Sequence, residues 1–237
     1  MIYFCLVTLG GDDLVRLAIR SIQRYVKEPY QIHEFPLADP VTPASHGQAI
    51  NVWRTRYQQE VKETDYVVIM DPDVAILSPW WQREATRAFD DPTVGIWGAG
   101  ASEDFRLRVH ASMMVIRGSA WKTLDRSFTP CTDPRERDWR DTGGLYCMFA
   151  KAAGWKVVPV ERGLDWHGVS AWYAQPRNTL WGVPLAEGGC RAMWAHLGGG
   201  TWSDPTRMTR WQRIRRRTVI RQRRQFISIV QSHMQCS

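Results

Sequence analysis

A run of five apolar, β-favouring residues, Tyr66 to Met70, is followed at once by Asp71-Pro72-Asp73. The run has no polar side, which is typical of a strand buried on both faces of a parallel sheet. The ligands of such sheets lie beyond the carboxyl ends of the strands. The sequence therefore places two carboxylates, one residue apart, at the end of the sheet where α/β proteins bind their ligands.

Strand and helix patterns alternate around this run. The elements expected before it are a strand, a helix, a strand and a helix, at residues 2–9, 14–25, 31–37 and 48–61. This order predicts parallel pairing through right-handed crossovers. Those expected after it are strands at 93–97, 111–116 and 155–160 and a helix at 142–153. The predicted fold class is α/β, a mostly parallel sheet flanked by helices, with a basic helical tail.

The positive charge of the chain is concentrated at its C-terminal end. The sequence has 31 lysines and arginines against 24 acids. Nine of the arginines lie within residues 207–237, which contain no lysine and no acid, so the preceding residues hold 22 bases and 24 acids. Such asymmetry is typical of a near-neutral folded body joined to a segment that binds a polyanion. We expect one domain over residues 1–206 and an Arg-rich helix or tail over residues 207–237.

Arginine suits phosphate groups because its guanidinium can donate two parallel hydrogen bonds. Two polyanions fit the C-terminal segment: a nucleic-acid backbone, bound in a salt-dependent way, and an anionic membrane surface. The third interpretation is a solvated helix face without a partner. The side chains expected to contact a polyanion are those of Arg210, Arg213, Arg215, Arg216, Arg217 and Arg221.

The composition excludes several other classes of protein. Hydrophobic residues make up 44% of the chain, which is enough for a sizeable core, so a disordered protein is excluded. The five cysteines include no C-x-x-C pair, which argues against a disulfide framework and against a structural zinc site. This cysteine usage predicts a reducing, cytoplasmic location.

The Asp71-Pro72-Asp73 group has two interpretations. Aspartate and proline both favour turns, so the three residues can form a simple turn. Carboxylates, together with the phosphate oxygens of a substrate, are also the ligands that Mg²⁺ and Mn²⁺ prefer. The buried strand before the group and the apolar residues 74–77 after it favour the metal site.

Several short motifs, in a fixed order over residues 1–206, resemble those of GT-A-fold glycosyltransferases, particularly the family 2-like group. Residues 65–74 resemble the DxD strand end, and His46-Gly47-Gln48-Ala49-Ile50-Asn51 is similar to the G-x-A-x-N segment that precedes it. Residues 109–117 resemble the strand that follows the acceptor loop. Residues 141–144 and Gly154-Trp155 resemble the acidic segment and helix that carry the catalytic base, and residues 196–200 resemble the late histidine segment of the metal and diphosphate site.

The resemblance implies transfer of a sugar from a nucleotide diphosphate donor, with a UDP-sugar favoured, to an acceptor hydroxyl, with inversion at the anomeric carbon. A bound Mn²⁺ or Mg²⁺ would neutralise the diphosphate leaving group. The metal ligands that the resemblance implies are Asp73, Asp71 and His196. The residues that it implies for donor binding are Thr8, Asp39, Asn51, Asp71 and Asp73, where Asp39 stands in for an acidic pair that the family often has.

The resemblance also implies a carboxylate that removes the acceptor proton as general base. The usual Glu-Asp motif is absent, and Asp138-Trp139-Arg140-Asp141 takes its place, so the base is Asp141 or Asp138. Asp141 also suits the N-cap of the helix that follows, and one residue can serve both purposes.

Three kinds of function stay open at this point. A nucleotide-sugar core joined to an Arg-only segment suggests an acceptor in DNA, a hydroxymethylated base, as with some bacteriophage glycosyltransferases. A lipid-linked or cell-envelope acceptor at a membrane surface is the alternative. A non-enzymatic nucleic-acid-binding protein would leave Asp71 and Asp73 unexplained. A fourth kind, a sugar-phosphate nucleotidyltransferase, is disfavoured. It would carry basic residues in a Gly-rich signature after the first strand, where this chain has Gly10-Gly11-Asp12-Asp13.

Overall fold

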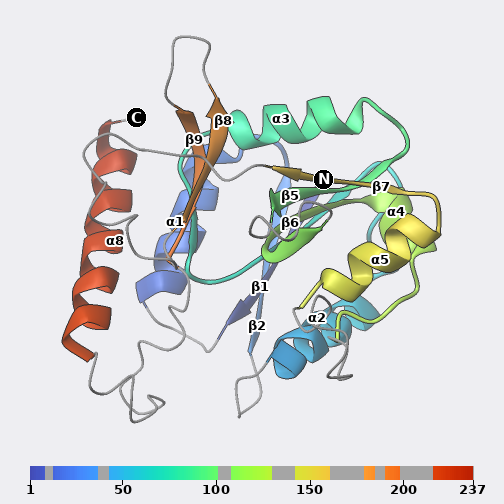
Figure 1. Cartoon of the computed structure of the whole chain (residues 1–237), viewed down its shortest axis with the longest axis horizontal. Coiled ribbons are helices and arrows are strands. Elements are labelled where there is room, and N and C mark those ends of the chain that lie inside the picture. The colour runs from blue at the N-terminus through green and yellow to red at the C-terminus, as the bar shows by residue number, and fades with distance from the viewer. Residues whose placement is uncertain are drawn as a thin grey trace. The chain divides into compact units, whose positions relative to one another are not determined.

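The computed structural model describes residues 1–8, 13–36, 43–100, 108–129, 142–160, 179–184, 190–197 and 216–236. The chain forms two compact units, and each has its own sheet (Figure 1). Unit 1 comprises Met1–Gly10, Val26–Asp71 and Gln82–Glu161, and unit 2 comprises Gly11–Tyr25, Pro72–Trp81 and Arg162–Ser237. The chain therefore passes from one unit to the other inside the Asp-Pro-Asp group.

Unit 1 contains a six-stranded sheet in the order β2-β1-β3-β6-β5-β7. β1 pairs in parallel with β2 and β3, and β5 with β7, whereas β6 is antiparallel to β3 and β5. The strands are β1 (Ile2–Thr8), β2 (Tyr30–Pro36), β3 (Tyr66–Met70), β5 (Val94–Gly100), β6 (Val109–Arg117) and β7 (Lys156–Val160). The helices are α2 (Pro43–Tyr57), α3 (Trp80–Phe89), α4 (Gly118–Thr123) and α5 (Gly144–Ala152), of which α3 begins in the preceding segment of unit 2. This confirms the predicted fold class, a mostly parallel sheet flanked by helices.

β1 and β3 end at the same edge of this sheet. They pair in parallel with Cys5 opposite Ile69 and Leu6 opposite Met70. Both strands are apolar and almost entirely buried, as their sequences predict. Because Asp71 follows Met70 directly, it lies at the carboxyl edge of the sheet, where the sequence placed it.

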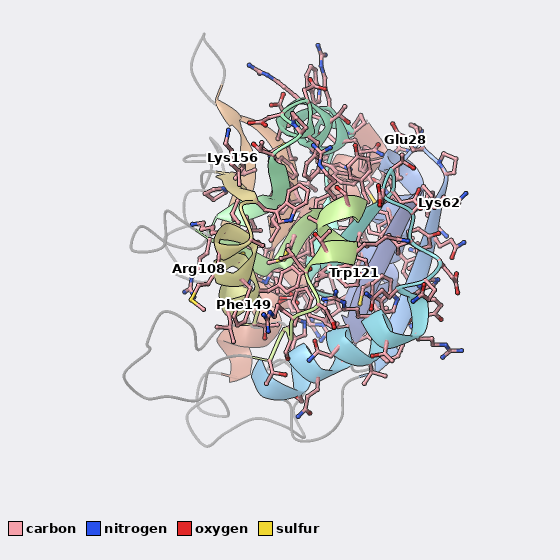
Figure 2. The ribbon with its side chains drawn as sticks, turned by 90° about the vertical axis from the view of Figure 1, so that its right-hand side faces the viewer. Glu28, Lys62, Arg108, Trp121, Phe149 and Lys156 are labelled. Atoms are coloured by element: carbon pink, nitrogen blue, oxygen red, sulfur yellow. The ribbon has the colours of Figure 1, made fainter. Side chains whose placement is uncertain are left out.

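Aromatic side chains form much of the unit 1 core. Trp53 of α2 and Trp121 of α4 are fully buried and meet edge to face, with ring centroids 5.5 Å apart. Phe128 stacks on Tyr146 of α5 at a centroid distance of 4.0 Å. Trp121 lies on α4 at the centre of the view in Figure 2. The large number of tryptophans in the sequence therefore serves core packing, at least in part.

Unit 2 contains a three-stranded antiparallel sheet in the order β4-β9-β8. Its strands are β4 (Val74–Ile76), β8 (Thr179–Pro184) and β9 (Cys190–His196), and its helices are α1 (Asp13–Tyr25) and α8 (Arg216–Cys236). Both helices and two strands share one apolar cluster, formed by Leu14, Leu17, Ala75, Leu77, Ala195, Leu197, Phe226 and Val230. The C-terminal helix is thus part of a packed core, to which it contributes Phe226 and Val230.

The predicted elements and the observed ones differ in a few places. The helix expected at 48–61 spans Pro43–Tyr57, because proline is well accommodated in a first helical turn. β8 and β9 lie in the stretch 161–206, where the sequence has no clear pattern. The domain boundary expected at residue 206 lies outside the described residues. None of the described helices combines the length and the apolar composition needed to cross a membrane.

His33 on β2 predicts a measurable pH dependence of stability. Trp53 Nε1 donates to His33 Nδ1 over 2.9 Å, which requires the neutral ring. Burial lowers the pKa of His33 below its ordinary 6.5, and nearby Arg56 adds to this while Glu60 opposes it. The unfolded chain therefore binds the proton more readily, so the free energy of unfolding should fall as the pH drops below 6.5 towards the folded pKa.

The comparison variant is His33→Gln, which does not titrate in this range. Its free energy of unfolding, from urea denaturation between pH 7 and pH 5, should fall less steeply than that of the wild type. Parallel pH curves for the two proteins would refute the assignment.

Candidate functional site

In unit 2, the buried Asp73 pairs with the partly buried His196. Asp73 Oδ1 lies 3.2 Å from His196 Nε2, and the two side chains are 5% and 13% exposed. A carboxylate withdrawn this far from water is stabilised by hydrogen bonds or by a positively charged partner, and a metal ion is one such partner. The pair is therefore a candidate ligand pair for a cation.

The pairing of β4 with β9 positions these two side chains. Val74 lies opposite His196 in the antiparallel register, and Leu197 N donates to Asp73 O over 3.0 Å. α1 supports β4, because Ile76 N donates to Ser21 Oγ over 2.9 Å. The short apolar strand after Asp73 thus joins the aspartate to a histidine from the distant end of the sequence.

In unit 1, Asp71 is held at its main chain and at its side chain. Asp71 N donates to Ser112 O over 3.0 Å, which extends the β3–β6 pairing one residue beyond Met70. Asp71 Oδ1 lies 3.1 Å from His46 Nε2, and the two side chains are 20% and 15% exposed. Each aspartate of the Asp-Pro-Asp group therefore has its own histidine partner.

The start of α2, which carries His46, is fixed by residues 127–129. A Cβ at Gly47 would lie 2.5 Å from Phe128 O, so only glycine allows this approach. Asn51 Nδ2 donates to Ser127 Oγ over 2.8 Å and to Thr129 Oγ1 over 3.2 Å, and Asn51 Oδ1 accepts from Phe128 N over 2.9 Å. The glycine and the asparagine of the G-x-A-x-N segment thus anchor the helix.

Asp71, Asp73 and His196 each offer one atom that can ligate a metal ion. Pro72 alone separates the two aspartates in the sequence. Neighbouring ligands of an octahedral Mg²⁺ lie about 3 Å apart. The 3.2 Å between Asp73 Oδ1 and His196 Nε2 agrees with that spacing. Two carboxylates and an imidazole therefore fit Mg²⁺ or Mn²⁺.

The structure describes some of the other residues predicted for donor binding and catalysis, and not the rest. Thr8 ends β1 and is buried. Asn51 has both ends of its amide engaged by residues 127–129, so its contact with a donor stays a prediction. Asp39, Asp138 and Asp141 lie outside the described residues.

The alternative role of Asp141 as a helix cap is wrong. α5 begins at Gly144, and its N-cap is Gly143, with φ 89° and no side-chain cap bond. The positive φ at this position strains residues that have a Cβ, so glycine is favoured there. Asp141 is therefore two residues before the cap.

The arginines expected to contact a polyanion fall into two groups. Arg216, Arg217 and Arg221 lie on α8. Those outside the described residues are Arg210, Arg213 and Arg215. The polyanion contact stays a prediction for both groups.

His46 is the residue of this region that sequence reasoning missed. It belongs to the segment that resembles G-x-A-x-N, but nothing in that pattern assigns a role to the histidine. Its contact with Asp71 depends on how α2 packs beside β1 and β2, which brings residues 25 positions apart together. Only the tertiary structure reveals the pair.

No protein-family model and no curated protein matches the sequence. Among solved structures, the mannosyltransferase PcManGT from Pyrobaculum calidifontis, in complex with GDP-Man and Mn²⁺, is 14% identical with a TM-score of 0.46, over 67% of this chain and 54% of that one. S. aureus TarS 1–349 is 10% identical with a TM-score of 0.42, over 66% and 57%. A glycosyltransferase involved in the glycosylation of the major capsid of PBCV-1 is 12% identical with a TM-score of 0.45, over 66% and 80%. The chain spans little more than half the length of the first two.

Proposed function

We propose that this chain is a metal-dependent glycosyltransferase that moves a sugar from a nucleotide diphosphate donor to an acceptor hydroxyl. The observation that carries the proposal is the Asp-Pro-Asp group after β3, whose buried Asp73 lies 3.2 Å from His196 Nε2. The ordered motifs of the sequence support the same reaction. They favour a UDP-sugar as the donor and inversion at the anomeric carbon.

The contacts support a separate role for each residue of the proposed site. Asp73 and His196, with Asp71, would hold a divalent cation, whose positive charge would offset the negative charge of the diphosphate leaving group. The Asp71 main chain, bonded to Ser112 O, keeps this carboxylate at the sheet edge. Asp141 or Asp138 stays the predicted base that takes the proton of the acceptor hydroxyl.

The direct test is the release of nucleoside diphosphate from UDP-, GDP-, CDP- and TDP-sugars, with Mn²⁺, with Mg²⁺ and with EDTA. We expect release from one donor class, dependent on the metal and faster when the right acceptor is added. Release that is equally fast in EDTA would contradict metal dependence. No release and no nucleotide binding with any donor would contradict the transferase.

We propose further that the acceptor lies in DNA, reached through the Arg-rich segment 207–237. The support is the nine arginines of that segment, which no acid offsets. A hydroxymethylated base supplies the hydroxyl that the reaction needs. The salt-dependent attraction of arginines for phosphates would bring the duplex to the enzyme.

Replacing six of the nine arginines of this segment should abolish DNA binding at low salt. The substitution is Arg→Gln at Arg210, Arg213, Arg215, Arg216, Arg217 and Arg221. Deleting residues 207–237 is unsuitable, because it removes Phe226 and Val230 from the unit 2 core. The plot of log affinity against log salt concentration should become shallower. The magnitude of its slope should fall by up to roughly one for each arginine replaced, since each arginine makes up to one phosphate contact. Fluorescence anisotropy with a labelled duplex measures both quantities.

The control carries Arg→Gln at three exposed arginines elsewhere, Arg56, Arg83 and Arg87, so it loses half as many charges as the test variant. It should bind DNA as the wild type does. An equal loss of affinity for each replaced arginine in the two variants would make the attraction a property of net charge alone. If the wild type binds no DNA at low salt but floats with anionic vesicles, the acceptor is instead lipid-linked or part of the cell envelope.

A further inference from the structure

The histidine partners of Asp71 and Asp73 belong to different units of the chain. Asp73 meets His196 across the β4–β9 pairing of unit 2, and the two belong to one group of ligand atoms with Asp71. His46 contacts Asp71 from α2 in unit 1 and is not a member of that group. His46 therefore contacts a candidate ligand carboxylate without itself belonging to the group of ligand atoms.

Packing around the start of α2 restricts the position of His46. It is 15% exposed in its side chain, and the next residue, Gly47, packs directly on the main chain of Phe128. Ala49 and Ile50 of the same helix are buried in the unit 1 core. One turn further, Asn51 makes three hydrogen bonds to residues 127–129. These anchors leave the imidazole little freedom to move away from Asp71.

We propose that His46 is a positioning residue, which fixes the direction in which the Asp71 carboxylate faces the bound cation. The inference rests on the proposed function, since it requires a cation at Asp71. A carboxylate can rotate about its terminal torsion, and a fixed neighbour limits that rotation. Groups that orient metal-ligating side chains in this way alter metal affinity by roughly 10- to 100-fold when they are replaced.

The test compares His46→Leu with His46→Gln. Leucine fills the space without an N–H group, whereas the amide nitrogen of glutamine reaches about as far from the main chain as Nε2 of histidine. Mn²⁺ binding to the full chain, without nucleotide or acceptor, is measured from the free-ion signal in electron paramagnetic resonance. Val52→Ala is the control, because Val52 lies on α2 and is 56% exposed.

We expect His46→Leu to weaken Mn²⁺ binding about tenfold, His46→Gln to restore most of it, and Val52→Ala to bind as the wild type does. All variants should unfold at the same denaturant concentration in EDTA within the spread of the control. Wild-type affinity in His46→Leu would overturn the positioning role and leave the proposed function intact. Complete loss that glutamine does not restore would also overturn it, because His46 would then be a ligand or essential to the fold. A wild type that binds neither Mn²⁺ nor any nucleoside diphosphate would defeat both proposals.

Discussion

Asp73→Asn should abolish the binding of Mn²⁺ and lower the metal-dependent turnover by on the order of 10²–10³-fold, as the loss of one preorganised charge-stabilising group does elsewhere. Asparagine keeps the size of the side chain but removes the charge that makes Asp73 a cation ligand. Asp73 is only 4% exposed, so water cannot take over this role. Release of nucleoside diphosphate from the preferred donor measures the turnover, and calorimetry measures the metal.

The matched control is Asp65→Asn. Asp65 is also buried, at 5% exposure, but it precedes β3 and so lies at the opposite end of this strand from Asp71. Its carboxylate accepts a hydrogen bond from Lys62 N and forms an ion pair with the Met1 amine, which gives it a structural role. This variant should lose stability and keep its affinity for Mn²⁺. Equal metal binding in Asp73→Asn and the wild type would remove Asp73 from the site.

Trp121→Ala should lower the free energy of unfolding by about 3–5 kcal/mol, the usual cost of replacing a buried tryptophan by alanine. Trp121 is fully buried between Trp53 and Phe128, with ring centroids at 5.5 Å and 6.0 Å. Its ring also faces the Arg54 guanidinium, 4.8 Å from the ring centroid. Removing the indole leaves a cavity and also removes one of the aromatic contacts of a buried cation, which keeps the Tyr146 ring.

Urea denaturation measures this loss, and Lys122→Ala is the control. Lys122 is the next residue on α4 and is exposed, so its replacement should change the free energy of unfolding by less than about 0.5 kcal/mol. A loss of less than about 1 kcal/mol in Trp121→Ala would mean that the aromatic cluster does not hold α4 against the sheet.

The sheet of unit 1 was the most predictable part of the fold. Tyr66 to Met70 is apolar throughout, and only a strand buried on both faces accounts for such a run of β-favouring residues. The position of Asp71 at the carboxyl edge followed from this one assignment. The periodicity of Leu14, Leu17 and Ile22 likewise predicted α1, since these side chains lie on its buried face.

The second sheet was not predictable in the same way. β4 has three residues, Val74–Ile76, too few to show a period, and its partner β9 lies in a stretch rich in glycine and tryptophan. A short strand takes its stability from its partner and not from its own sequence. The pairing of Asp73 with His196 depends on this sheet, so the sequence could suggest the histidine only through a resemblance.

The two histidine contacts show what local patterns omit. A lone histidine on a helix carries no signal of what it touches, and His46 becomes meaningful only through its 3.1 Å contact with Asp71. Asn51 shows the reverse case, because a residue matched to a donor-binding motif has an anchoring role that its three hydrogen bonds reveal. Gly143 likewise takes the cap position for which Asp141 was suited, because the left-handed backbone there, with φ 89°, favours glycine.

The most direct test of a metal-dependent nucleotide-sugar site is the melting temperature of the full chain with UDP, GDP, CDP or TDP, each with Mn²⁺ and with EDTA. At a hundred times its Kd, a nucleotide adds about 2.7 kcal/mol to the stability of the folded chain. For a chain of this size that is a rise of roughly 5–10 °C. We expect this rise with one of the four nucleotides, only with Mn²⁺, and not in Asp73→Asn. No rise with any of them would contradict the transferase and favour a protein that binds polyanions through its arginines alone.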